Sequence, residues 1–392
     1  MLNTPFSPWP SFTEEEANAV RDVVLSNKVN YWTGQECREF EREFAAWSGT
    51  EHAIALMNGT VALDVAMLAL GVGKGDEVIV TPRTFLASVS SIVNTGAVPV
   101  FAEVDADTQN ITAESIKAVL TPKTRAVICV HLAGWPCDMD PIMQLADEHN
   151  LFVIEDCAQA HGALYKGKPV GSIGHVGAWS FCQDKIMTTG GEGGMVTTND
   201  TALWKKMWAL KDHGKSWDAV YEREHAPGFR WLHESFGTNW RMTEMQAAIG
   251  RIQTQRMPEW NKQRLANANK IWEAARSIKG LRVPTIPVDI HHAAYKCYVF
   301  VEPSALKPDW NRDRIINAIV ESGVPCYSGS CSEVYLEKAF DGTDFRPSKP
   351  MEVARELGET SLMFLVHPTL TPAEIDKTCA VLQEVMGLAT KA

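Results

Sequence analysis

Between about residues 50 and 200, short apolar runs alternate with segments in which apolar residues recur at helical spacing. Five runs are predominantly apolar, which predicts strands over 52–57, 77–80, 98–101, 126–131 and 151–154. Segments between them predict helices over 61–70, 85–95 and 142–148. Strands that alternate with helices are typical of an α/β fold with a mostly parallel sheet that is covered by helices on both faces.

A different pattern begins near residue 242. Apolar residues at helical spacing predict one or two long helices over 242–278, then a strand over 298–302 and helices over 312–321 and 372–386. This succession predicts a smaller α+β domain at residues 253–392, after a large domain at residues 1–252. A capping box from Thr13 to Glu16 predicts the start of the first helix, and we expect the dozen residues before it to pack with the smaller domain.

Composition and charge narrow the class of protein. Hydrophobic residues make up 45% and charged residues 22% of the 392 residues, which is typical of a globular chain and excludes a disordered chain, a fibre or a coiled coil. The 37 basic and 48 acidic residues give a net charge of −11. That balance argues against a nucleic-acid partner and against binding to an anionic membrane surface.

The distribution of apolar residues and cysteines predicts a cytoplasmic location. No segment reaches the roughly 20 apolar residues of a membrane span, and the N-terminus lacks the basic and apolar regions of a secretion signal. The nine cysteines include no CxxC pair, which indicates reduced thiols and argues against a zinc site. We therefore expect no metal.

The first candidate site is Asn58-Gly59-Thr60, between a predicted strand and a predicted helix. The free N–H groups and the dipole at a helix N-terminus favour a phosphate, and a glycine followed by a hydroxyl suits that role. The alternative is an Asn/Gly turn in which Thr60 only caps the helix.

The second candidate site is an acid at the end of a strand, in the run 153–162 (VIEDCAQAHG). A buried carboxylate needs a partner, and Asp156 would keep a pyridinium nitrogen protonated. A helix cap or a structural ion pair is the alternative. His161, in the same run, is a candidate metal ligand or acid–base group, but a packed histidine is the favoured interpretation.

The third candidate site is Lys185, between a strand-like segment and the glycines of the run 179–194 (WSFCQDKIMTTGGEGG). Its apolar and aromatic neighbours favour a partly desolvated amine, which a Schiff-base lysine requires. The glycines permit unusual backbone angles, but the loop lacks the order of a P-loop. Phe85, which follows the predicted strand over 77–80, is suited to stack on a flat ring, with a core aromatic as the alternative.

Together these residues supply a phosphate anchor, a ring stack, an acid for a ring nitrogen and an amine for an aldehyde. Those are the parts that hold pyridoxal 5′-phosphate. The chain has no GxGxxG after a first strand and no GxSxG nucleophile elbow, so no competing set of residues is present.

With these residues in view, the sequence resembles the DegT/DnrJ/EryC1/StrS family of sugar aminotransferases over nearly its full length. The resemblance is carried by the stretches 33–63, 77–105, 153–163 (VIEDCAQAHGA), 179–196 (WSFCQDKIMTTGGEGGMV) and 237–253 (GTNWRMTEMQAAIGRIQ). The last three, in that order and spacing, are highly specific. The resemblance implies the fold type I architecture of pyridoxal phosphate enzymes and a homodimer.

The resemblance also implies roles for single residues. Lys185 matches the lysine that forms the Schiff base with the cofactor, and Asp156 matches the residue that is paired with the pyridine nitrogen. Gln159 matches a residue near the ring oxygen of the cofactor, and Phe85 matches the ring-stacking position.

The phosphate-binding positions of the family are matched by Gly59, Thr60 and Ser180. Asn239 matches an asparagine that reaches the phosphate of the neighbouring subunit. The resemblance therefore implies active sites that two chains share.

The activity implied by the resemblance is a ping-pong transamination. L-glutamate donates the amino group and leaves as 2-oxoglutarate, Lys185 moves the proton from the donor Cα, and a nucleotide-linked keto-sugar accepts the amine. Such enzymes supply amino sugars for surface polysaccharide or a glycosylated product. The stretch 323–335 lacks the Tyr–x–Pro–Leu–His ending that is common in the family near the sugar, which suggests a subgroup with its own acceptor.

Three other functions compete with this one. A pyridoxamine-dependent sugar dehydratase has the same fold, but such members replace the lysine that this chain keeps at position 185. A non-catalytic sensor or scaffold would be favoured by loss of Lys185 or Asp156, and both are present. A fold type I enzyme acting on amino acids, such as a lyase, fits the motifs less well.

Overall fold

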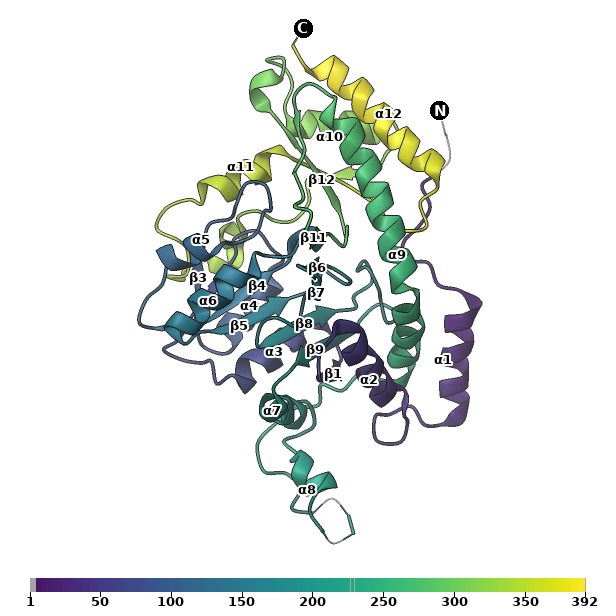
Figure 1. Ribbon diagram of the computed structural model, residues 1–392, viewed down its shortest axis with the longest axis vertical. Coiled ribbons are helices and arrows are strands. Elements are labelled where there is room, and N and C mark those ends of the chain that lie inside the picture. Colours follow the sequence, from purple (N-terminus) through teal and green to yellow (C-terminus); the bar gives the residue numbers. More distant parts are fainter. Residues whose placement is uncertain (1–4, 226, 229, 392) are drawn as a thin grey trace.

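A seven-stranded mixed sheet forms the centre of the larger lobe in the computed structural model, which describes residues 5–225, 227–228 and 230–391 (Figure 1). Strand β9 runs antiparallel to both of its neighbours, and the other six strands are parallel to one another. In spatial order the strands are β1 (His52–Leu56), β9 (Gly194–Thr198), β8 (Val176–Ser180), β5 (Phe152–Asp156), β4 (Thr124–Val130), β2 (Glu77–Val80) and β3 (Val98–Phe101).

Alternate residues of these strands pack on opposite faces of the sheet, as the period of a strand requires. Ile54 of β1 packs with α3, α4 and α7 on one face. Ala53 and Ala55 face α2 and the first half of α9, and Val127 of β4 faces α5 and α6 on the same side of the sheet. The predicted arrangement, a mostly parallel sheet covered on both faces, is therefore confirmed.

The helices that were predicted around this sheet, α1, α3, α4 and α6, lie close to the predicted positions, and β2 and β3 match their predicted bounds, whereas α2, α5, α7 and α8 were not predicted. The first helix begins after Thr13, whose N–H donates to the Glu16 carboxylate at 2.9 Å, as predicted. The helices are α1 (Glu14–Ser26), α2 (Glu36–Ser48), α3 (Gly59–Ala69), α4 (Ala87–Asn94), α5 (Ala113–Ala118), α6 (Met139–His149), α7 (Thr201–Lys211) and α8 (Trp217–Tyr221), with a 3-10 turn at Leu132–Gly134.

A second lobe contains a four-stranded antiparallel sheet in the order β10 (Leu281–Arg282), β12 (Cys297–Val301), β14 (Ser361–Phe364) and β13 (Cys326–Tyr327). Its helices are α10 (Arg312–Glu321), α11 (Glu352–Thr360) and α12 (Pro372–Ala389), and 3-10 turns lie at Pro303–Ala305, Val334–Leu336 and Lys338–Phe340. A small three-stranded sheet, β11 (Ile290–His291), β6 (Leu164–Tyr165) and β7 (Lys168–Pro169), joins segments of both lobes.

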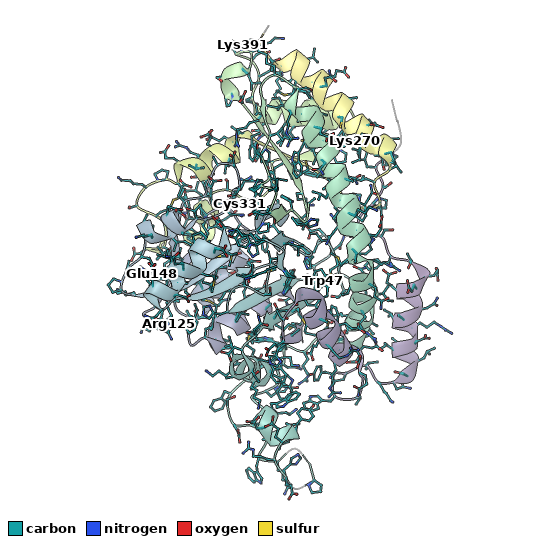
Figure 2. All side chains as sticks on the ribbon, viewed as in Figure 1. Trp47, Arg125, Glu148, Lys270, Cys331 and Lys391 are labelled. Atoms are coloured by element: carbon teal, nitrogen blue, oxygen red, sulfur yellow. The ribbon has the colours of Figure 1, made fainter. Side chains whose placement is uncertain are left out.

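Helix α9 (Glu244–Arg276) links the two lobes as one continuous helix of 33 residues, about 50 Å long at 1.5 Å per residue (Figure 1). Its first half packs on α2 and its second half packs on α12. In the second half, Lys270 lies 2.5 Å from Asp376 of α12 (Figure 2). The predicted domain boundary between residues 252 and 253 falls inside this helix, and it remains a prediction.

The N-terminal segment crosses between the lobes. Phe6 packs on the core of the second lobe, and the Ser7 hydroxyl donates to Glu374 of α12 at 3.1 Å. Residues 1–4 of the expected N-terminal dozen lie outside the described residues. Over the described part of the chain, no helix combines the length and the apolar character that crossing a membrane requires.

Candidate active site

The carboxyl ends of β1, β2, β5 and β8 open into one cavity of about 580 Å³. Ligands in open α/β sheets bind at this edge, where the loops begin. Seven of the eight site residues that the sequence predicts line this cavity: Gly59, Thr60, Phe85, Asp156, Gln159, Ser180 and Lys185. The eighth, Asn239, is not part of its lining.

The N-terminus of α3 and the end of β8 form one wall of the cavity. The helix is capped by Asn58, whose side-chain oxygen accepts from the Val61 N–H at 2.9 Å, so the cap is Asn58 rather than Thr60. A Cβ on Gly59 would lie 2.5 Å from the Ser180 Cβ and 2.9 Å from its hydroxyl. Glycine thus lets the first turn of the helix approach the Ser180 hydroxyl, next to N–H groups that have no partner within the helix.

Asp156 ends β5 and its carboxylate lies against the cavity, buried by the fold. Ser88 donates its hydroxyl to Oδ2 at 2.8 Å, and the Ala158 N–H donates to Oδ1 at 3.2 Å. Burial raises the pKa of the Asp156 carboxyl, and these hydrogen bonds oppose the rise only in part. A cation placed in the cavity would favour the charged form.

Gln159 is oriented by a backbone contact. Its side-chain oxygen accepts from the N–H of Ala133 at 2.9 Å, and its side chain lines the cavity. Because the oxygen is occupied, the amide N–H groups are the part of Gln159 that can serve a ligand, and they suit an oxygen acceptor.

Phe85 lies at the rim of the cavity with 74% of its surface exposed, so the core-aromatic interpretation is wrong and the ring remains free to stack. The loop that carries it is fixed by Arg83, which is fully buried. The Arg83 guanidinium donates to Gln109 at 3.0 Å and to the Ser332 hydroxyl at 2.7 Å, which ties this loop to the second lobe.

Lys185 reaches the cavity from the loop after β8. Its Nζ lies 3.4 Å from Asp184 Oδ1 and 3.5 Å from the hydroxyl of Tyr295, which also donates to Asp184 Oδ2. The Trp9 indole N–H donates to the Lys185 carbonyl at 2.8 Å and fixes the backbone there. The glycine turn behaves as predicted, because Gly190 and other glycines of this loop adopt positive φ.

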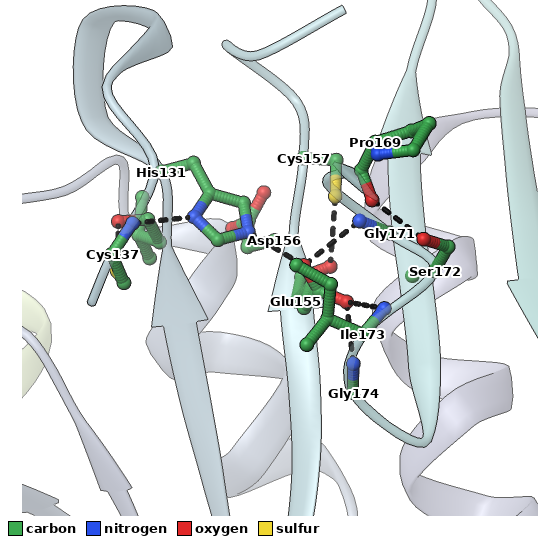
Figure 3. A network of polar contacts seen from close by, with 12 residues as sticks. His131, Cys137, Glu155, Asp156, Cys157, Pro169, Gly171, Ser172, Ile173 and Gly174 are labelled. Carbon is green, nitrogen blue, oxygen red and sulfur yellow. Dashed lines mark hydrogen bonds and ion pairs between the residues drawn. The ribbon is translucent and has the colours of Figure 1, made fainter. Parts of the chain in front are cut away.

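The neighbour of Asp156 on β5 has a different environment. Both oxygens of Glu155 are saturated: Oε2 accepts from His131 Nε2 at 2.9 Å and from the Gly171 N–H at 2.8 Å, and Oε1 accepts from Ile173 and Gly174 at 2.8 and 2.6 Å (Figure 3). Burial acts to raise the pKa of Glu155, but these donors hold it below its usual value. The carboxylate therefore anchors the loop before β8.

His131, Glu155 and Cys157 are close enough to suggest a metal site, since their ligand atoms lie within 4.8 Å of one another. The Cys137 N–H donates to His131 Nδ1 at 3.0 Å, so Nε2 carries the ring proton toward Glu155 (Figure 3). A metal would have to displace that proton and the backbone donors, so the cluster is built as a hydrogen-bond network.

His161 is a packed histidine, as the favoured interpretation predicts. Its ring lies 5.3 Å from that of Trp179 and 5.7 Å from that of Phe181, and neither nitrogen has a hydrogen-bond partner among the described residues. Burial lowers the pKa of His161 to about 3, so the ring stays neutral.

Asn239 lies on the segment that returns from α8, outside its own cavity and exposed. Figure 1 shows α8 and the adjoining chain projecting from the larger lobe. Asn239 pairs with Asp212 in an antiparallel bridge, and on the same segment Trp231 and Phe236 are 90% and 100% exposed.

Several residues of the site were not predicted from the sequence. Ser88 and Glu192 line the cavity, and Asp184 and Tyr295 surround the lysine amine. Asp184 adjoins Lys185 and Ser88 follows Phe85 by three residues, so local sequence contained a signal for both. Tyr295 lies 110 residues from Lys185, and no local pattern indicates that contact.

Comparisons with known proteins agree with this geometry. A family model described as the DegT/DnrJ/EryC1/StrS aminotransferase family matches residues 10–383. A solved aminotransferase from Psychrobacter cryohalolentis is 66% identical, with a TM-score of 0.96 over 98% of this chain and 99% of that one. The GDP-perosamine synthase of Caulobacter vibrioides is 36% identical over 93% of this chain and 95% of that protein. A protein from Streptococcus pneumoniae, solved in its PLP-form, is 25% identical, with a TM-score of 0.88 and coverage of 99% of both chains.

Proposed function

The chain belongs to the DegT/DnrJ/EryC1/StrS aminotransferase family, and from that premise we propose that it transfers the amino group of L-glutamate to the keto group of a nucleotide-linked sugar. The observation that carries the proposal is the convergence of an amine, a buried carboxylate and a helix N-terminus on one cavity. The GDP-perosamine synthase of Caulobacter vibrioides, a relative over nearly the whole chain, supports a sugar nucleotide as the acceptor.

The cofactor is pyridoxal 5′-phosphate, as for the relative solved in its PLP-form, and the residues of the cavity fit it. Gly59, Thr60 and Ser180 would hold the phosphate at the N-terminus of α3, and the buried Asp156 carboxylate would hold the ring nitrogen. When bound, the cofactor supplies an aldehyde for amines and a ring that withdraws electrons from them.

Lys185 has two tasks in this proposal. Its Nζ would first hold the cofactor, and after the donor displaces it, the neutral amine would take the proton from the donor Cα and deliver it to the aldehyde carbon of the cofactor. The Gln159 amide N–H groups orient the ring oxygen, and Phe85 covers one face of the ring and excludes water. Reversal of these steps serves the keto-sugar.

The active enzyme in this proposal is a homodimer with shared sites. Phe85, Trp231 and Phe236 expose large apolar surfaces on a single chain, and a partner chain would bury them. Asn239 is exposed and lies outside its own cavity, so a second copy is the place where it could reach a phosphate. These observations support a site that one chain does not complete alone.

The product in this proposal is an amino sugar for a surface polysaccharide or a glycosylated product, made in the cytoplasm. All nine cysteines are free, including the exposed Cys331, which supports a reducing compartment. In this proposal the acceptor sugar differs from that of family members with the Tyr–x–Pro–Leu–His segment near the sugar, since the stretch 323–335 lacks that segment.

The test is the visible spectrum of the purified protein with pyridoxal 5′-phosphate. We expect a yellow band that bleaches when L-glutamate is added and returns with one of a panel of keto-sugars linked to GDP, UDP or dTDP. The Lys185→Ala protein is the matched control, since it retains the cavity but cannot form the yellow species. A yellow protein that ignores glutamate would exclude this donor, and a protein with no yellow band would exclude the enzyme.

A further inference from the structure

Asp184 and Tyr295 form a polar pair against the amine of Lys185. The Tyr295 hydroxyl donates to Asp184 Oδ2, and the Lys185 Nζ lies 3.5 Å from that hydroxyl and 3.4 Å from Asp184 Oδ1. The three polar groups form a triangle in which one carboxylate oxygen is occupied by the tyrosine and the other faces the amine. Neither residue has a role in the function proposed above.

The two members of the pair differ in how firmly they are held. Tyr295 is buried, and its N–H donates to the Ala133 carbonyl at 2.9 Å in the turn that Gln159 also holds. Asp184 lies in the cavity wall with 57% of its side chain exposed. The buried tyrosine therefore fixes the orientation of a carboxylate that solvent reaches.

Other charged groups lie close to the Lys185 amine and to the Asp184–Tyr295 pair. Lys296, whose Nζ lies 4.6 Å from the centre of the Tyr295 ring, is partly buried, and burial lowers its pKa to about 8. Arg264 of α9 and Lys185 add to that decrease, while Asp184 opposes it. From the other side, Asp156 faces Lys185 across the cavity, and His161 stays neutral. Lys296 and Arg264 are cations close to Lys185, so a protonated Lys185 amine needs a fixed carboxylate beside it.

We propose that Asp184 and Tyr295 are positioning residues that hold the Lys185 amine after the amino donor has displaced it, and that stabilise its protonated form. The proposal rests on the aminotransferase function argued above. It assigns the resting place of the displaced amine to this pair.

The chemistry requires such a place. The neutral amine accepts the proton from the donor Cα and becomes an ammonium group, while the electron pair of the C–H bond would be withdrawn by the bound cofactor. The ammonium must then remain within reach until it gives that proton to the carbon of the cofactor that carried the aldehyde. Asp184 Oδ1 supplies a charge-assisted acceptor for it, and Tyr295 keeps Oδ1 pointed at Nζ by binding Oδ2.

The first experiment reads the Lys185 amine directly, in the full chain without cofactor. Lysines are reductively methylated with ¹³C-formaldehyde, and the Lys185 signal is assigned by its loss in Lys185→Ala. In Asp184→Asn we expect the pH midpoint of that signal to fall by about half a unit, a small shift because the pair is partly solvated. Tyr295→Phe should lower it less, and Asp184→Glu should restore it in part.

The matched control is Asp140→Asn, which removes a carboxylate 2.7 Å from the exposed Lys166. It should move the Lys166 signal and leave that of Lys185 in place. An unchanged Lys185 midpoint in both Asp184→Asn and Tyr295→Phe would overturn the proposal. If Asp184→Asn fails to fold, Tyr295→Phe alone decides, since it removes only the hydroxyl.

The second experiment measures bleaching of the yellow band by L-glutamate across pH. We expect Asp184→Asn to slow the maximal rate about tenfold and to move its pH profile toward acid, with a smaller change in the glutamate concentration for half-maximal rate. Wild-type protein that does not bleach would exclude the proposed function. Bleaching by wild type with an unmoved profile in both variants would exclude only the role of this pair.

Discussion

The two acids at the end of β5 stand side by side in the chain but belong to different regions. Glu155 faces the loop before β8 and accepts four hydrogen bonds from His131 and three backbone N–H groups. The Asp156 carboxylate faces the cavity and accepts only from Ser88 and Ala158 among the described residues. We call the Glu155 network the closed region, because the chain itself fills every acceptor position. We call the cavity at Asp156 the open region, because it has room for a ligand.

This difference shows how a buried acid with a functional role can be recognised. A carboxylate whose oxygens are saturated by the chain has its burial compensated within the fold, so it contributes to structure. A carboxylate beside a cavity that accepts few hydrogen bonds is only partly compensated for the desolvation of its charged form. A cationic ligand in the cavity would supply the rest of that compensation. The opposite pKa directions of Glu155 and Asp156 express the same contrast, although burial acts to raise both.

The largest effect should come from the open region. Lys185→Ala is expected to lower transamination by about 10⁴-fold or more, because no other amine can hold the cofactor and move the Cα proton. Its thermal unfolding should match that of wild type, since the Glu155 network is untouched. Steady-state assays and circular dichroism check this, and a variant with substantial activity would contradict the site.

Asp156→Asn tests the open acid itself. We expect a decrease in rate of about 10²-fold to 10³-fold with little loss of stability, because an amide cannot hold a protonated ring nitrogen. Ser88→Ala is the matched control, since it removes a hydrogen bond but keeps the charge, and it should cost much less. Comparable rates in Asp156→Asn and wild type, measured in single turnovers, would make Asp156 a structural residue.

Glu155→Gln tests the closed acid and should have the reverse effect. The amide places N–H groups against N–H donors, so we expect a loss of about 3 kcal/mol of unfolding free energy at neutral pH. The folded-state pKa is lowered, so this stabilisation is present above the usual pKa of 4.5 and is lost as pH falls through the folded value. Chemical denaturation should therefore show the two proteins converging in acid, whereas the exposed Glu148→Gln should differ little at any pH.

The smallest effect should come from Asn239→Ala, which in the proposed homodimer changes the cavity of the neighbouring chain. Losing one hydrogen bond to the phosphate should weaken cofactor affinity about fivefold, measured by fluorescence titration. Hybrid dimers of Asn239→Ala with Lys185→Ala sharpen the test. If the contact crosses between subunits, the hybrid regains one site of full affinity, and if it does not, no site recovers.

Much of the fold could be predicted from local pattern. Strands β2 and β3 and helix α10 have the predicted bounds, because their apolar periodicity and end signals lie within a few residues. The antiparallel strand β9 was not predicted, because Gly194–Thr198 owes its place to pairing with β1 and β8, far away in sequence. The segment after α7 was also missed, since Trp217 and Val220 of α8 pack on the core only through the tertiary fold, and Trp231 and Phe236 stay exposed.

The residues of the site also fall into those that the local sequence predicts and those that it does not. Residues next to strand ends, such as Asp156 and Lys185, could be located because topology gathers those ends at one edge. The partners that distinguish them could not, because Tyr295 and His131 reach Lys185 and Glu155 only through the tertiary fold. The sequence also could not show that Asn58, and not Thr60, caps α3, since both residues suit that position.

The hydrogen bond from Trp9 to the Lys185 carbonyl joins residues that are 176 positions apart. In the same N-terminal segment, Ser7 donates to Glu374 of α12. Residues 7–9 therefore contact both the second lobe and the backbone of Lys185. For protein engineering this makes the N-terminus part of the working enzyme. A fusion that displaces the segment of Ser7 and Trp9, or a library that shortens it, will act on catalysis as well as on folding.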